Sequence, residues 1–110
     1  MRIFFKTAKF EKVCINAKKA RKEYGPRGGD LLLLRLQQLA AASRLSDMRH
    51  MPGRCHELTG DRAGVLSIDL VHPLRLLFEP EAPRPVKDDG GLDWTKVEGV
   101  VICRVEDTHD

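Results

Sequence analysis

The chain has 110 residues, 42% of them hydrophobic, which is enough for one compact domain with a modest core and too short for two. It holds no run of about 18 apolar residues and no apolar signal-peptide centre, so we expect a cytoplasmic protein that does not enter a membrane. The net charge of +3 is uneven, because residues 1–27 hold nine Lys and Arg against two acids and residues 79–110 hold four against nine; a basic front half suits a polyphosphate partner or a plain solvated surface.

The first 26 residues predict a strand and then a basic helix. Residues 1–5, MRIFF, are apolar and predict an opening strand, and Thr7 is a suitable N-cap for the helix after it. The apolar residues of this helix recur at helical spacing: Phe10, Val13, Cys14 and Ala17. Tyr24-Gly25-Pro26 then predicts the end of the helix, because Gly favours a left-handed turn and Pro discourages continuation.

A loop over residues 26–29 and a second helix over residues 31–45 come next. Asp30 offers an N-cap, and LLLLRLQQLAAASRL is rich in strong helix formers. The stripe that we expect to face the core consists of Leu32, Leu36, Leu39, Ala40 and Ser43. The two helices therefore form a hairpin that must cover an apolar surface.

The second half of the chain predicts strands. Residues 64–71 and 74–79 alternate apolar with polar side chains on either side of a short turn, so they predict an antiparallel hairpin. Residues 80–96 hold three prolines and two glycines and predict a long loop, in which Trp94 anchors the loop to the body.

The last predicted element is a β-branched strand over residues 97–107, with Val101, Cys103 and Val105 on one side. The order β-α-α-β-β-β predicts an α+β fold in which the helical hairpin packs on one face of a small antiparallel sheet, within a single domain spanning residues 1–110. The other face of that sheet is expected to stay partly open.

Cysteine, metal and cofactor chemistry have little support. Cys14, Cys55 and Cys103 are odd in number and scattered, which favours reduced thiols that pack in the core. The chain has no C-x-x-C or H-x-x-x-H pair, so no metal is expected, and no glycine-rich nucleotide motif, so no cofactor is expected. Neither Cys55 nor Ser67 stands in a local nucleophile signature.

The remaining candidates are imidazole and guanidinium groups with one acid: Arg54, His56, Arg62, Arg75, Asp107 and His109. Metal-independent RNA cleavage requires a base for the 2′-hydroxyl, an acid for the departing 5′-oxygen and cations at the phosphate. Histidine suits the proton steps and arginine suits the phosphate. Each residue also has a purely structural interpretation, and Arg75 in particular is placed to pair with Asp69 across the hairpin.

Three motifs resemble one toxin family: RCHELTGDRAGVLSIDL (54–70), HPLRLLFEP (72–80) and VEDTHD (105–110). Together they are similar to the HigB branch of the RelE/ParE superfamily, the killer proteins of plasmid maintenance systems, and the resemblance covers nearly the whole chain. It implies a RelE-like fold and cleavage of mRNA in the ribosomal A site, with a 2′,3′-cyclic phosphate as product. It also implies a HigA-like helix-turn-helix antitoxin as partner and contact with operator DNA only through that antitoxin.

The resemblance assigns roles by motif position. His56 matches the active-site histidine, Arg75 the arginine near the scissile phosphate, and Asp107 with His109 the terminal proton-handling pair. The residues expected to bind RNA are Arg54, Arg62, Lys18 and Lys22.

Two positions depart from the family pattern. Thr59 stands where many members have a lysine that stabilises the phosphate, a loss that typically costs about a hundredfold in rate. Thr108 stands where a tyrosine would stack on a base, a contact of about 1–3 kcal/mol. A non-catalytic RelE-fold module that binds the ribosome or an antitoxin, and a ParE-like toxin directed at gyrase, therefore remain as alternatives.

Overall fold

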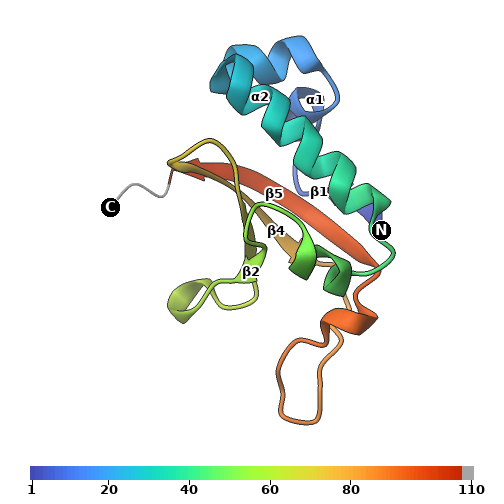
Figure 1. The fold of residues 1–110 in the computed structure, drawn as a ribbon. Coiled ribbons are helices and arrows are strands. Elements are labelled where there is room, and N and C mark those ends of the chain that lie inside the picture. Colours follow the sequence, from blue (N-terminus) through green and yellow to red (C-terminus); the bar gives the residue numbers. More distant parts are fainter. Residues whose placement is uncertain (108–110) are drawn as a thin grey trace.

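The computed structural model describes residues 1–107 (Figure 1). One strand comes first in the chain, the two helices follow, and the other strands fill the second half. The helices and strands are β1 (Arg2–Phe5), α1 (Ala8–Cys14), α2 (Ala17–Ala41), β2 (His56–Glu57), β3 (Leu66–Asp69), β4 (Leu74–Pro80) and β5 (Gly99–Asp107). Three short 3-10 turns lie at Leu45–His50, Gly60–Arg62 and Trp94–Lys96. The fold class is α+β, as the sequence predicts.

The sheet is mixed, with five strands in the order β1-β5-β4-β3-β2. β1 runs parallel to β5, with Phe4 opposite Val101, and the other neighbours are antiparallel. The prediction of a purely antiparallel sheet was therefore wrong for β1. The helices and the remaining strands together form the long connection that a parallel pair requires.

The helical region breaks earlier than the sequence predicts. Thr7 caps α1 as expected, by accepting a hydrogen bond from the backbone N–H of Phe10 at 3.2 Å. α1 then stops at Cys14, and Asn16 caps a new segment by accepting from the N–H of Lys19 at 3.1 Å. The predicted continuous helix to residue 24 was wrong because this asparagine offers a competing N-cap.

α2 is interrupted at Gly25, where φ is 81° and ψ is 163°, so the predicted break at this residue is confirmed. The predicted loop over residues 26–29 is helical instead, since Pro26 begins the second segment, as proline does readily. Gly29 allows the two segments to touch, because a Cβ atom there would lie 2.5 Å from the backbone N of Arg21. Asp30 is not an N-cap; its carboxylate pairs with Arg21 Nε at 2.6 Å.

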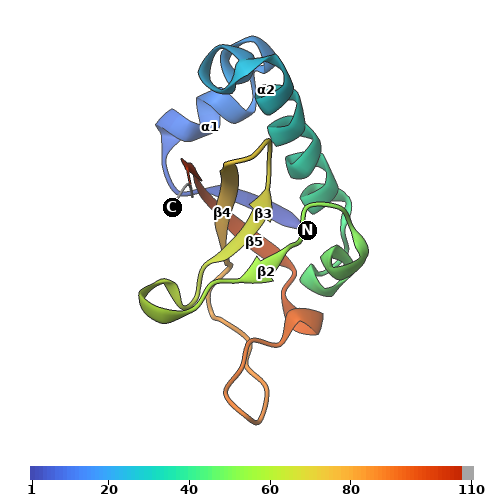
Figure 2. The same cartoon turned by 60° about the vertical axis from the view of Figure 1, so that its left-hand side comes forward.

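α2 lies across one face of the sheet and buries the core against it (Figures 1 and 2). Leu32 and Leu39 are fully buried as predicted. Ala40 is exposed because it lies off the stripe that these two leucines form with Arg35, and Ser43 is exposed beyond the end of the helix at Ala41. The fully buried side chains that the sheet contributes to the core are Leu66, Ile68, Leu76, Phe78, Val100 and Ile102, and Ser67 and Leu77 of the same strands are also fully buried. No helix among residues 1–107 combines the length and the apolar character needed to cross a membrane.

A bulge between β4 and β5 sets which side chains share a face. Leu76 pairs with Val105 and Phe78 pairs with Ile102, so the ladder shifts by one residue between them. Val105 therefore lies on the core face, and the prediction that it shares a side with Val101 and Cys103 was wrong. A bulge of this kind is invisible to a simple alternation of residues.

The loop after β4 is anchored to the body at its C-terminal end, just before β5 (Figure 1). Trp94 is 5% exposed, donates from its indole N–H to Glu57 at 3.0 Å and lies 3.9 Å below the Arg49 guanidinium, so the predicted anchor is confirmed. A single bridge between Val86 and Leu92 gives the loop some regular structure that the sequence did not predict.

Candidate functional site

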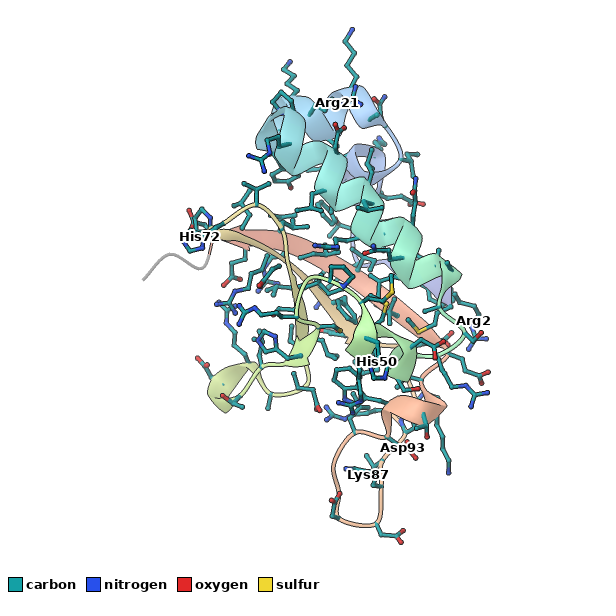
Figure 3. All side chains as sticks on the ribbon, in the orientation of Figure 1. Arg2, Arg21, His50, His72, Lys87 and Asp93 are labelled. Carbon is teal, nitrogen blue, oxygen red and sulfur yellow. The ribbon has the colours of Figure 1, made fainter. Side chains whose placement is uncertain are left out.

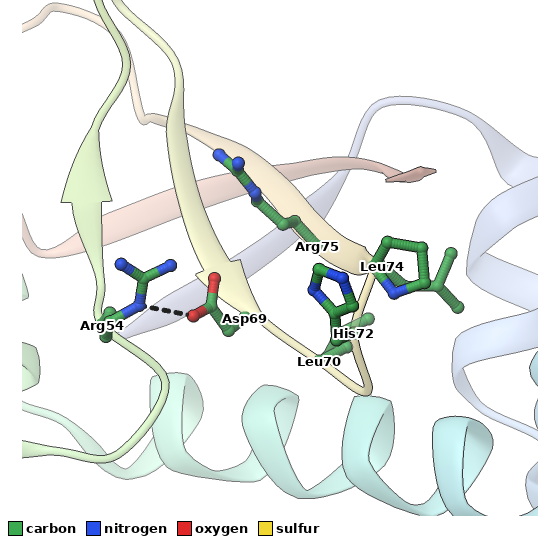
Figure 4. Close-up of a pocket in the computed structure, with 7 residues that line it drawn as sticks. Arg54, Asp69, Leu70, His72, Leu74 and Arg75 are labelled. Carbon is green, nitrogen blue, oxygen red and sulfur yellow. Dashed lines mark hydrogen bonds and ion pairs between the residues drawn. The ribbon is translucent and has the colours of Figure 1, made fainter. Parts of the chain in front are cut away.

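The face of the sheet that points away from α2 is polar and carries the candidate residues (Figure 4). The strand register places Asp69 of β3 opposite Arg75 of β4, and Arg75 opposite Glu106 of β5. Two further arginines, Arg54 and Arg62, come from the irregular segment that flanks β2. Asp69, Arg75 and Glu106 thus form a row across three strands. Arg54 and Arg62, from outside the β3-β4 hairpin, form ion pairs with the two acids of this row.

Arg54 takes the first carboxylate of this row. Its Nε donates to Asp69 Oδ2 at 2.6 Å, and this hydrogen bond raises the pKa of the Arg54 guanidinium. The backbone of Arg54 is left-handed, with φ at 49°, a conformation that costs non-glycine residues about 1–3 kcal/mol in sparsely populated regions. The Asp69 N–H donates to the Gly53 carbonyl at 2.7 Å, so the strained residue is fixed on both sides.

Glu106 is taken by two other arginines. Arg62 Nη2 pairs with one of its carboxylate oxygens, and Arg104 Nη2 donates to the other at 3.2 Å. The hydrogen bond from Arg62 is the largest cause that lowers the pKa of Glu106. Burial opposes it, and the charge of Arg62 and the hydrogen bond and charge of Arg104 add to the lowering. Arg62 is therefore engaged with the protein rather than held open for a ligand.

Arg75 is left between these two pairs. Within residues 1–107 its guanidinium forms no ion pair and no side-chain hydrogen bond, although both of its cross-strand neighbours are acids. The structural interpretation in which Arg75 pairs with Asp69 across the hairpin is thus wrong, because Arg54 occupies that carboxylate. A half-buried cation whose neighbouring carboxylates are already paired favours an external anion.

Two hollows meet at Arg75. The larger, of about 500 Å³, is lined by Leu58, Thr59, Asp61, Arg62, Arg75, Glu106 and Asp107. The smaller, of about 160 Å³, is lined by Arg54, Asp69, Leu70, His72, Pro73, Leu74 and Arg75 (Figure 4). The structure therefore brings Arg62, Arg75 and Asp107 together in one cleft, with Thr59 on its wall.

His56 lies beside these hollows and is held in a fixed orientation. Its Nδ1 is 2.6 Å from the Arg54 carbonyl, so this nitrogen carries the proton and donates it. Its Nε2 is 3.5 Å from the Ser67 hydroxyl. Among the described residues, those that line the two hollows do not include His56.

The other predicted site residues lie elsewhere. Lys18 and Lys22 are exposed at the start of α2, beside Arg21, which Figure 3 labels on the helical layer, and neither lysine is among the described residues that line the hollows. The structure does not bring them to the cleft. His109 and Thr108 lie outside the described residues 1–107.

The cysteines offer no reactive thiolate in the folded chain. Burial raises the pKa of Cys14 and of Cys55 to about 12 each, and burial also raises the pKa of Cys103. All three thiols are free, as expected. Among residues 1–107, no three His, Cys, Asp or Glu side chains are grouped closely enough to hold a metal ion.

Two residues support the candidate site that sequence reasoning did not select. Arg35 of α2 is 8% exposed, and its Nε donates to the Asp69 carbonyl at 3.2 Å, which fixes the end of β3. Its spacing of three from Leu32 and four from Leu39, on the buried stripe, was the available signal. His72 lines the smaller hollow from the hairpin turn, a position that only the register of β3 and β4 reveals.

No protein-family model matches the sequence, and no curated protein is significantly similar to it.

Proposed function

We propose that this protein is a HigB-like toxin of the RelE/ParE superfamily that cleaves mRNA in the ribosomal A site without a metal or cofactor. In this proposal it acts in the cytoplasm, and a HigA-like helix-turn-helix antitoxin neutralises it and carries it to operator DNA. A helical layer on one face of a small sheet, with a polar opposite face, fits the RelE-like arrangement that the motifs imply.

The observation that carries the proposal is Arg75. It is a half-buried guanidinium with no ion pair within residues 1–107, at the junction of two hollows and beside Asp107. Guanidinium groups bind phosphate in bidentate geometry, and a cation that has no internal partner gains most from an incoming phosphodiester. The motif position of Arg75 and its spatial position thus point to the same chemistry.

The proposed reaction is transesterification within the RNA strand. The ribose 2′-oxygen forms a bond to the adjacent phosphorus as the bond from phosphorus to the 5′-oxygen breaks, which leaves a 2′,3′-cyclic phosphate. In this proposal Asp107 and His109 share the proton transfers, so that one of them takes the 2′-hydroxyl proton and the other gives a proton to the departing 5′-oxygen. Arg75 stabilises the charge that develops on the phosphate. His56 matches the active-site histidine of the family by motif position, and its Nε2 lies 3.5 Å from the Ser67 hydroxyl.

The ribosome is the proposed second partner. Lys18 and Lys22 belong to a basic surface on α1 and the first part of α2, at a distance from the cleft, where they can bind ribosomal RNA while the cleft holds mRNA. Such contacts are electrostatic, so ribosome binding should weaken as salt increases.

A second candidate, a binding module without catalysis, is favoured by two features of the larger hollow. Its wall carries Thr59 where the family pattern has lysine, and Arg62 is paired with Glu106. The lining residues then supply three acids against two arginines, which weakens the attraction of the cleft for a phosphate.

Primer extension on an mRNA translated by purified ribosomes tests the proposal. The wild-type protein should produce cuts in the A-site codon, and Arg75→Gln should slow them about a hundredfold, because one cation at the reacting phosphate is lost. Asp107→Asn should lower the rate in the same direction.

The matched control is Arg2→Gln, which removes an exposed arginine that pairs with Glu81 at 2.6 Å on the far edge strand. It should cut at the wild-type rate. If the protein co-sediments with ribosomes in a salt-sensitive way but leaves the mRNA intact, the binding module replaces the enzyme as the proposed function. If it neither binds ribosomes nor cuts mRNA, both proposals are wrong.

A further inference from the structure

The smaller hollow is lined by Arg54 and His72, which the proposed cleavage step leaves unused, and by Arg75, which it shares with the larger hollow. It lies between the strained segment before β2 and the turn that joins β3 to β4 (Figure 4). Arg54, His72 and Arg75 contribute to its lining, and Asp69 is its one acid. We infer that this hollow is a second oxyanion site, which binds the phosphate next to the scissile one in single-stranded RNA; the RNA part of this inference rests on the proposed function.

Arg54 is prepared to bind an anion while it stays attached to the protein. Only its Nε is used in the bond to Asp69, so the donors on its two terminal nitrogens remain for a ligand. The ion pair with Asp69 fixes the direction of the guanidinium, and a donor fixed in advance loses little entropy on binding.

The backbone around Arg54 is held in an unfavourable conformation by close packing. Its φ of 49° is left-handed, and Gly53 before it lies so close to the body that a Cβ atom would be 2.7 Å from Ile68 Cγ2. The same Cβ atom would be 2.9 Å from Arg35 Nε, and Arg35 also holds the Asp69 carbonyl. Strain that the surrounding structure maintains is typical of positions where a side chain must be aimed at a ligand.

The charge balance distinguishes this hollow from the larger cleft. Its lining has two arginines against one acid, and that acid is already paired with one of them. The larger cleft has two arginines against three acids. The local attraction for a phosphate is therefore stronger in the smaller hollow.

Arg75 connects the two sites because it lines both of them. A strand whose scissile phosphate sits on the Asp107 side of Arg75 can continue past this side chain toward Arg54 and His72. The imidazole N–H of His72 is exposed at the turn and can donate to the same oxyanion. The smaller hollow then holds the strand in register while the larger one holds the reacting atoms.

Titration with inorganic phosphate, followed by NMR of the arginine Nε–H and histidine ring signals, tests the hollow by itself. The Arg54 and Arg75 signals and those of His72 should shift together, and Arg54→Gln should weaken phosphate binding by about tenfold. Arg2→Gln, the matched loss of a paired surface arginine, should leave the affinity unchanged. Shifts no larger at Arg54 than at Arg2 would overturn the site whatever the protein does to RNA.

A second measurement links the hollow to the strand. The dinucleotide UpU and its 5′-phosphorylated form pUpU differ by one phosphate, and that phosphate should raise the affinity of the wild-type protein by about tenfold. Arg54→Gln should abolish this difference. Equal affinities in the wild type would refute the placement of the second phosphate.

The two proposals fail in different ways. Phosphate and pUpU binding without any ribosome-dependent cut would keep the oxyanion site and remove the nuclease. Ribosome-dependent cuts with no effect of Arg54→Gln on phosphate or pUpU binding would keep the nuclease and remove the second site.

Discussion

The two faces of the β3-β4 hairpin follow different rules. On the face toward α2, apolar residues that lie two apart in each strand are fully buried. Ile68 of β3 and Leu76 of β4 are two of them, and they lie opposite each other in the antiparallel hairpin. On the opposite face, the registered neighbours Asp69 and Arg75 do not pair with each other. Hydrophobic burial depends on which side of the sheet a residue faces. Ion pairing depends also on which charged side chains other segments of the chain bring close to that residue.

The difference teaches where local sequence stops being informative. Asp69 is taken by Arg54, fifteen residues earlier in the chain, and Glu106 is taken by Arg62, from the turn before β3. Both competing arginines come from irregular segments, whose paths the alternation of the strands does not define. That Arg75 has no ion pair within residues 1–107 is thus a consequence of the path of residues 53–62, the segment with the weakest sequence pattern.

Truncation on the core face should have the largest effect on stability. Phe78 is 0% exposed, so Phe78→Ala removes a large buried ring and should lower the free energy of unfolding by about 3–5 kcal/mol, measured by urea denaturation. Phe4→Ala is the control on the other side of the sheet, at 42% exposure, and should change it by less than about 1 kcal/mol. Similar losses from both variants would mean that the two faces are not distinct.

Arg35 is the exception on the core side, because it is a charged residue inside the apolar stripe. Arg35→Met keeps the length of the side chain but leaves the Asp69 carbonyl without its donor, so unfolding should become easier by about 1–3 kcal/mol. Arg27→Met, an exposed arginine on the same helix, should change stability by less than about 0.5 kcal/mol. An equally stable Arg35→Met variant would show that the end of β3 does not depend on this bond.

The elements of the fold were predictable where one local signal dominates. β1, the β3-β4 hairpin, the Thr7 cap and the Gly25 break all follow from short patterns, as does the anchoring of Trp94. The parallel pairing of β1 with β5 was not predictable, because nothing in the five residues of the opening strand indicates which edge receives it. The early end of α1 was missed because the helical spacing continues through Asn16.

The candidate site was predictable as a set of residues and not as an arrangement. The motifs selected Arg54, Arg62, Arg75 and Asp107, and the structure places all four around two adjoining hollows. Which carboxylate each arginine pairs with required the three-dimensional path of residues 53–62. His72 was missed because a histidine in a turn has no periodic signal.

Arg75→Gln should separate function from stability on the open face. Since Arg75 has no ion pair within residues 1–107, its charge contributes little to folding, and the free energy of unfolding should change by less than about 0.5 kcal/mol. Thermal or urea denaturation measures this beside the large loss of cleavage expected for the same variant. A stability loss comparable to that of Arg35→Met would show that Arg75 is a structural residue.

The smallest effect concerns Glu106 and appears only in acid. Arg62 and then Arg104 hold its pKa below the ordinary value of 4.5, so its carboxylate stabilises the folded state fully above about pH 4.5. The contribution declines as the pH falls through the lowered folded-state pKa, because the protonated acid no longer attracts the arginines.

Glu106→Gln should therefore flatten the loss of stability below pH 4.5 in urea denaturation at a series of pH values. Arg62→Gln should flatten it in part, since Arg62 is the main cause of the lowered pKa. The control is Arg84→Gln, because the Arg84 side chain is 40% exposed, as that of Arg62 is, and pairs with Glu57 instead. This variant should lose stability with falling pH as steeply as the wild type does. If Glu106→Gln also kept the wild-type pH dependence, the acid sensitivity would belong to another part of the chain.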